Sequence, residues 1–195
     1  MSTAPTIASR VLTSLPGRNP VRDSADLAYR CVVKQARQPI FFTRYGVPDT
    51  LDGRFELICL HAFLYLHRLK AEGPQAKQIG QSFFDRMFTD FDRALREMGT
   101  GDLSVGKHVK RMVRAFYGRI RAYEEGLSAD APTLDAALIR NVFGTVPGSP
   151  QLTGMMARYV RSAAIELRRQ PTADLLAGHI SFVVPVDPGQ IGEAQ

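Results

Sequence analysis

Apolar residues recur at spacings of three and four positions along most of this chain, from about residue 24 to about residue 177. That period places apolar side chains on one face of an α-helix, and no run alternating every second residue occurs before the C-terminal end. The expected helices, separated by prolines and glycines, span residues 25–38, 51–70, 74–98, 104–125, 134–143, 150–170 and 172–177. The sequence therefore predicts an all-α protein with a single compact bundle of about six to seven helices.

The same pattern divides the chain into three segments. Prolines interrupt any long helix near the start, and Ser24 is the expected N-cap of the first helix. Near the end, Pro185 and Pro188 prevent an apolar run from forming a central strand. We therefore expect a flexible N-terminal tail, a helical domain and an extended C-terminal tail, at residues 1–23, 24–178 and 179–195.

The expected helices at 51–70 and 74–98 differ in how their apolar residues are placed. The first is apolar on nearly every side between Phe55 and Leu66, which is typical of a helix surrounded by others. This window is shorter than the ~20 residues needed to span a bilayer, so we interpret it as a buried core helix. The second carries a continuous stripe that we interpret as a packed core face, with an aromatic binding platform as the alternative. The stripe consists of Ile79, Phe83, Phe84, Met87, Phe88, Phe91, Leu95 and Met98.

The expected helix at 104–125 has two contrasting sides. Its apolar residues gather around Phe116, while its cations gather on the opposite side with no acid until Glu124. Like charges on neighbouring turns repel each other, so this basic stripe is either a solvated face or a docking surface for an anionic partner. Gly118 interrupts the stripe at a cost of about 1 kcal/mol relative to alanine, which indicates close packing or contact with a partner. The candidate partner-binding residues, which form the basic stripe, are Lys107, Lys110, Arg111, Arg114 and Arg121.

The net charge indicates the class of partner, and the cysteines indicate the redox state of the compartment. The formal net charge of +6 and the pI near 9.6 favour an anionic partner, which includes nucleic acid, a lipid surface and an acidic protein. The two cysteines, Cys31 and Cys59, lie in apolar helical stretches without metal-ligand spacing. We interpret them as buried free thiols in a reducing compartment.

No group of residues has the spacing of a catalytic or metal-binding motif. The phosphate-binding, dinucleotide-binding, nucleophile-elbow and zinc-protease motifs are all absent from the sequence. Glu56 is five residues from His61, and His67 is six residues from it, so neither pair fits a metal site of a helical bundle. We interpret His61 as a hydrogen-bonded core residue. We therefore expect no catalysis, no cofactor and no metal; the alternative is a bundle enzyme that uses Glu56, His61 or His67.

Two long stretches carry an ordered series of motifs. They read FTRYGVPDTLDGRFELICLHAFLYLHRLK at Phe42–Lys70 and FDRALREMGTGDLSVGKHVKRMVRAFYGRIRAYEEGL at Phe91–Leu127. The most specific parts are the YGVP turn at 45–48, REMG at 96–99, the segment 102–112 and FYGR at 116–119. In this order and spacing the chain resembles the ubiquinol-cytochrome c chaperone family, the bacterial branch of a group that includes the mitochondrial cytochrome b assembly factor.

The resemblance implies an assembly chaperone that binds newly made cytochrome b and assists biogenesis of the respiratory bc1 complex. It implies a cytoplasmic location with peripheral attachment at the inner membrane face, and we expect no DNA partner. The basic stripe would then meet the ribosome, an anionic membrane surface or a small protein partner. An exposed apolar patch of more than a few hundred Å² should lie next to the stripe. The alternative function is a helical RNA- or ribosome-binding module that uses the same stripe.

Overall fold

The computed structural model describes residues 19–128, 131–146 and 149–186. Over these residues the chain is helical and contains no strand, which confirms the prediction of an all-α bundle. Six helices are long and two, α2 and α8, have five residues each. The helices are α1 (Pro20–Ala36), α2 (Pro39–Thr43), α3 (Leu51–Leu69), α4 (Gly73–Glu97), α5 (Asp102–Ser128), α6 (Ala131–Asn141), α7 (Pro150–Arg169) and α8 (Thr172–Leu176).

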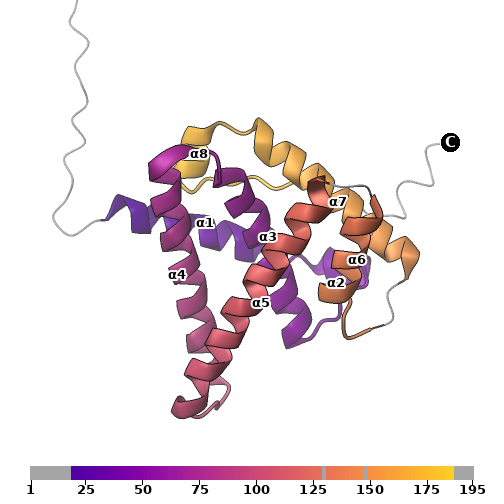
Figure 1. Ribbon diagram of the computed structural model, residues 1–195, viewed down its shortest axis with the longest axis horizontal. Coiled ribbons are helices and arrows are strands. Elements are labelled where there is room, and N and C mark those ends of the chain that lie inside the picture. Colours follow the sequence, from indigo (N-terminus) through magenta and orange to yellow (C-terminus); the bar gives the residue numbers. More distant parts are fainter. Residues whose placement is uncertain (1–18, 129–130, 147–148, 187–195) are drawn as a thin grey trace, which may run out of the picture.

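Helix α3 forms the centre of the bundle, as its all-round apolar sequence predicts. Every residue from Leu57 to Tyr65 is buried. Helices α1, α4, α5 and α7 all pack against α3, and Figure 1 shows it running through the middle of the ribbon. Burial on all sides leaves no face of its middle turns for a partner.

Helices α4 and α5 pack along each other and meet at a turn that projects beyond the other helices (Figure 1). Their contact is aromatic, with the ring centroids of Phe88 and Phe116 6.0 Å apart. Most of the predicted apolar stripe of α4 is buried, which confirms its interpretation as a core face. Phe84 and Leu95 are half-buried, and Met98, just after the helix, is 52% exposed. The stripe continues to the projecting turn, where fewer neighbouring helices remain to cover it.

Two local predictions were wrong. Helix α1 begins at Pro20 rather than after Ser24, because Asn19 is the N-cap and accepts a hydrogen bond from the amide of Val21 at 3.1 Å. The expected linker after Pro39 contains the short helix α2, since a proline that ends one helix is also well suited to the first position of the next. The division into tails and domain stays a prediction, because residues 1–18 and 187–195 lie outside the described ones.

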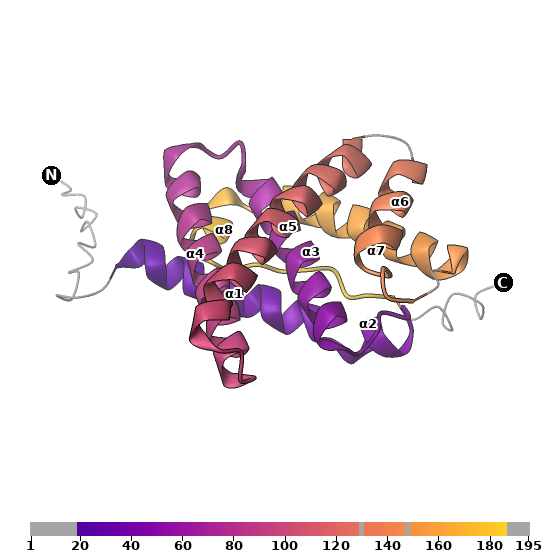
Figure 2. The ribbon, with the colours of Figure 1, turned by 60° about the horizontal axis from the view of Figure 1, so that its bottom comes forward.

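The segment after α8, residues 179–186, is extended and lies against the bundle (Figure 2). Side chains from three distant elements hold its backbone. The amide of Gln170 donates to the carbonyl of Ser181 at 2.6 Å, and that of Gln35 donates to the carbonyl of Val183 at 3.1 Å. The Tyr45 hydroxyl donates to the carbonyl of Val186 at 3.2 Å. This segment is therefore part of the folded core region even though it forms no helix.

Candidate functional site

The basic stripe lies on the outer edge of α5. Four of its five cations are exposed and have no carboxylate within ion-pair distance in the part of the chain that the structure describes; these four unpaired cations are Lys107, Lys110, Arg111 and Arg114. Arg121 differs, because its Nε lies 2.9 Å from an oxygen of Glu125 one turn further on. The structure thus brings the predicted residues onto one exposed edge, while their role in partner binding stays a prediction.

The carboxylates of the neighbouring helix are already engaged elsewhere. On α4, Asp92 lies 2.7 Å from Arg96, and Asp90 lies 2.5 Å from Arg93. Asp90 also accepts a hydrogen bond from the hydroxyl of Tyr29 on α1 at 2.9 Å. Because these acids are paired within α4 or with α1, they leave the stripe on α5 electropositive.

The aromatic residues of α5 divide between its two sides. Phe116 and Tyr123 are fully buried, on the side that packs against the bundle. Tyr117 is 58% exposed and lies one turn from Arg114, at the flank of the stripe. Its ring packs against Phe84 of α4, with centroids 5.7 Å apart. On the described part of α5, the basic stripe therefore has one exposed aromatic neighbour, Tyr117, whose ring packs on Phe84 of α4.

Two glycines of α5 have opposite surroundings. Apart from its chain neighbours and the backbone of its own helix, no described atom lies within 4 Å of the position that a Cβ on Gly118 would occupy. Of the two explanations expected for this glycine, close packing is therefore excluded, and contact with a partner stays a prediction. A Cβ on Gly126 would instead lie 2.7 Å from the Cα of Leu134 on α6. Close helix contact explains Gly126, whereas Gly118 opens onto solvent in the middle of the stripe.

His61 is a fully buried, hydrogen-bonded core residue, which confirms its interpretation from the sequence. Its Nδ1 lies 2.7 Å from the carbonyl oxygen of Leu57, and its Nε2 lies 2.7 Å from the hydroxyl of Tyr159. That hydroxyl accepts a hydrogen bond from the amide of Gln35 at 2.9 Å. A neutral ring that donates from Nδ1 and accepts at Nε2 satisfies every contact. Burial lowers the pKa of His61 to about 4, so the ring is neutral near pH 7.

Glu56 forms a bidentate ion pair with Arg119 of α5. The Nε of Arg119 lies 2.6 Å from one carboxylate oxygen, and an Nη donates to the other. The side chain of Glu56 is 9% exposed and that of Arg119 is 16% exposed. Burial raises the pKa of Glu56 above its usual value, and the guanidinium opposes this shift. This pair joins α3 to α5 across 63 residues of sequence.

His67, the third residue of the enzyme alternative, contacts a different partner. Its Nδ1 lies 3.5 Å from an oxygen of Glu124, which also pairs with Lys70 at 2.9 Å. Glu56, His61 and His67 thus have separate partners, and they line neither the hollow beside Tyr45 nor the one between α5 and α6. No cluster of three or more metal-ligating side chains occurs among the described residues.

Both cysteines are free, as predicted. Cys59 is fully buried in α3, and burial raises the pKa of its thiol well above the usual value. Cys31 is only half-buried, and its sulfur lies 3.8 Å from the carbonyl oxygen of Gly178. The thiols therefore act as packed side chains in this structure.

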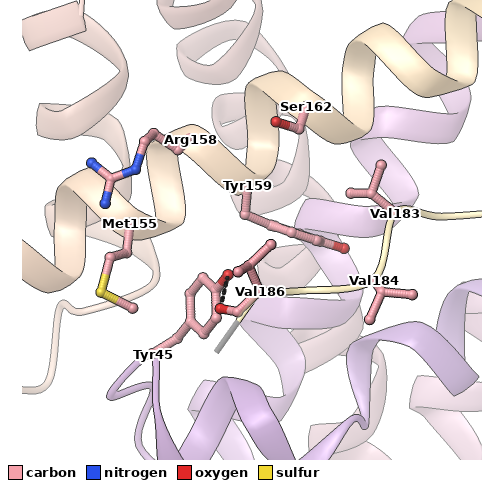
Figure 3. A pocket seen from close by; sticks show the side chains of 8 residues that line it. All are labelled: Tyr45, Met155, Arg158, Tyr159, Ser162, Val183, Val184 and Val186. Atoms are coloured by element: carbon pink, nitrogen blue, oxygen red, sulfur yellow. Dashed lines mark hydrogen bonds between the residues drawn. The ribbon is translucent and has the colours of Figure 1, made fainter. Parts of the chain in front are cut away.

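An apolar groove of about 390 Å³ opens on the surface beside the extended segment. Figure 3 shows Tyr45 hydrogen-bonded to the backbone at Val186, with side chains of α7 along the other wall. Val184 and Val186 are 81% and 54% exposed at this place. The lining residues are Tyr45, Met155, Arg158, Tyr159, Ser162, Val183, Val184 and Val186. None of them belongs to α5, so an apolar patch next to the basic stripe stays a prediction.

None of the described helices combines the length and the apolar character that crossing a membrane would require.

The described chain is a helical bundle with a buried ion pair between α3 and α5 and a cationic outer edge on α5. Residues 43–182 match the sequence profile described as "Ubiquinol-cytochrome C chaperone", and the chain belongs to this family. The resemblance found in the sequence motifs is thereby confirmed.

Curated relatives carry names that agree with the family. The chain is 30% identical over 148 residues to ubiquinol-cytochrome-c reductase complex assembly factor 1 of Xenopus laevis, covering 76% of this chain and 74% of the relative. It is 30% identical over 155 residues to the Homo sapiens protein of that name, covering 79% and 52% respectively. It is 27% identical over 149 residues to Protein CBP3, mitochondrial, of Saccharomyces cerevisiae, covering 74% and 44%. The chain thus spans about half the length of the human and yeast relatives.

A solved structure shares the fold. The crystal structure of the Cbp3 homolog from Brucella abortus superposes with a TM-score of 0.76 at 38% sequence identity. The match covers 85% of this chain and 91% of that one. The helical architecture is therefore that of a bacterial member of the same group.

Proposed function

We propose that this chain is an assembly chaperone that binds newly made cytochrome b and assists biogenesis of the respiratory bc1 complex without catalysing a reaction. The single observation that carries the proposal is the family match over residues 43–182. Relatives covered by that region are named as assembly factors of ubiquinol-cytochrome c reductase, which is the bc1 complex.

Two features of the structure support a binding role over an enzymatic one. Two titratable groups inside the bundle, His61 and Glu56, are each held by a protein partner, and neither lines the apolar groove. The apolar groove beside Val184 offers surface to an apolar client such as a membrane protein before its insertion.

The location and further partners belong to the same proposal. We expect the chain to act in the cytoplasm, peripherally at the inner membrane face, with the basic stripe meeting an anionic partner. The free thiols are consistent with a reducing compartment. A small protein partner and the ribosome are further candidates for contact, since both could present acidic groups or phosphates to Arg111 and its neighbours.

The proposal is tested by deleting the gene in cells that depend on a bc1 complex. We expect the assembled bc1 complex and cytochrome b to fall while the other respiratory complexes stay at their normal level. A plasmid copy of the natural sequence should restore both. Affinity capture of the chain during rapid growth should recover cytochrome b. Normal bc1 levels in the deletion strain would refute the chaperone function.

The alternative, an RNA- or ribosome-binding module, rests on the four unpaired cations. Phosphate contacts would make its RNA affinity fall steeply with salt. Replacing Lys110, Arg111 and Arg114 with glutamate should then abolish retention on immobilised RNA and flatten the salt dependence. If the natural protein shows no retention at low salt, the alternative is excluded.

A further inference from the structure

We propose that the outer edge of α5 docks on an anionic lipid bilayer, with the four unpaired cations over the lipid headgroups and Tyr117 at the level of the interface. The inference rests on the peripheral location proposed above and names the partner of the basic stripe, but it does not require cytochrome b as the client. Its test uses purified protein and vesicles, so it can fail while the chaperone function stands, or the reverse.

The cations form a straight row rather than a scattered surface charge. Lys107, Arg111 and Arg114 are separated by four and three residues, so they lie along one edge of the helix over about 10 Å. Lys110 lies beside them, one turn before Arg114. Like charges at this spacing repel one another, and no described carboxylate relieves the repulsion. An anionic plane placed along the edge would neutralise all four charges at once.

The surroundings of the stripe favour a lipid surface over RNA. Single-stranded RNA is bound by several exposed aromatic rings on which bases stack. The described part of α5 exposes one such ring, Tyr117, whereas Phe116 and Tyr123 are buried. A single tyrosine next to cations is typical of interfacial anchors, since its apolar ring and polar hydroxyl suit the headgroup region. Phe84 supports this ring from the side of α4 and so holds it beside the row.

Gly118 fits the same arrangement. It lies in the row between Arg114 and Arg121 and it is exposed. Outside its own helix backbone and chain neighbours, no described atom comes within 4 Å of the place that a Cβ would take. Neither packing nor a positive φ accounts for a glycine here. The absence of a side chain lets the backbone edge come close to a flat partner without a protruding group.

The primary experiment is flotation of the full chain with vesicles. Phosphatidylcholine vesicles that contain phosphatidylglycerol should carry the protein at low salt, and pure phosphatidylcholine vesicles should not. Binding should vanish as salt rises, because the Debye length shrinks from ~10 Å at 0.1 M to ~3 Å at 1 M. Equal binding to both vesicle types, or binding unchanged by salt, would overturn the proposal.

Matched charge-reversal variants locate the contact. Replacing Lys110, Arg111 and Arg114 with glutamate should lower vesicle affinity roughly a hundredfold, because each cation near an anionic surface contributes about a factor of five or more. The control reverses three exposed cations, Arg30 and Lys34 of α1 and Arg37 directly after it, and so changes the net charge equally. The control variant should keep most of the binding. Equal losses in the two variants would show attraction by net charge alone and would refute the site on α5.

A fluorescent variant tests the position of Tyr117. The chain contains no tryptophan, so Tyr117→Trp introduces a single reporter. Its emission should shift to shorter wavelength on anionic vesicles and stay unchanged on neutral ones. An unshifted spectrum with bound protein would contradict the orientation.

The natural protein is also tested on immobilised polyuridylic acid at the same salt concentration. If it binds this RNA but not the anionic vesicles, RNA is the partner of the stripe and the proposal is overturned. Circular dichroism checks that every variant keeps the helical fold.

Discussion

Arg114 and Arg119 lie on the same helix five residues apart, yet the guanidinium of Arg119 is paired inside the protein and that of Arg114 is exposed to solvent. Arg119 faces the bundle and is held by both carboxylate oxygens of Glu56. Arg114 faces solvent and has no acidic partner among the described residues. A buried charge without a partner is costly, whereas an exposed charge is hydrated by water. The inner edge of α5 therefore serves stability, and its outer edge is free to serve binding.

The largest expected effect comes from breaking the inner pair. Arg119→Ala leaves Glu56 buried without its partner, so the free energy of unfolding should fall by about 3–5 kcal/mol. Arg114→Ala, the matched control on the outer edge, should change it by less than about 0.5 kcal/mol. Urea unfolding followed by circular dichroism measures both. Similar changes in the free energy of unfolding for the two variants would contradict the different roles assigned to the inner and outer edges of α5.

The next effect concerns the neutral interior around His61. The folded-state pKa of about 4 is below the ordinary 6.5, so the unfolded chain takes up a proton that the folded chain excludes. This contribution to stability is complete above pH 6.5 and is lost as pH falls toward 4, by on the order of 3 kcal/mol. The measurement is the free energy of unfolding as a function of pH between 4 and 7, and its slope reports the proton uptake on unfolding. His61→Gln should be less stable at pH 7 and show a shallower slope; an unchanged slope would contradict the assignment.

A smaller loss is expected at the packed glycine. Gly126→Ala would place a Cβ 2.7 Å from the Cα of Leu134, so α5 and α6 must move apart. Overpacking of this kind costs about 1–3 kcal/mol. Thermal unfolding of the variant should show the loss as a lower midpoint temperature. No loss would mean that the α5–α6 contact yields without strain.

The smallest effect has the opposite sign. Gly118→Ala adds a methyl group to open space in a helix, so the free energy of unfolding should rise by about 0.5–1 kcal/mol. The same thermal measurement compares it directly with Gly126→Ala. A destabilised Gly118→Ala would show that this glycine has a structural role inside the chain.

Helix periodicity predicted most of the fold because each amphipathic face is encoded locally. The central position of α3 and the exposed position of Arg111 on α5 both follow from counting about 100° per residue. Local rules were ambiguous where one residue fits two roles. Pro39 was interpreted as the end of a helix, and it also starts α2.

Long-range pairing was beyond the reach of the sequence pattern. Nothing in the local sequence of Glu56 indicates that Arg119 will meet it, because the two are joined only when α3 and α5 pack. The two acceptors of the Gln35 amide could not be found either, since the Tyr159 hydroxyl and the carbonyl of Val183 lie 124 and 148 residues away in the sequence. Apolar periodicity places helices against one another, but it does not specify which polar groups meet between them.

The extended segment after α8 is attached to the bundle mainly through its own backbone carbonyl groups. Its carbonyl groups are held by Gln35, Tyr45 and Gln170. The ring of Phe182 packs edge-on against that of His61, with centroids 5.2 Å apart. A segment held by a few side-chain hydrogen bonds, without helical hydrogen bonds of its own, should open at lower free energy than the packed helices. Protease cleavage after Gly178 should therefore report the earliest opening of the protein, well before its helices melt.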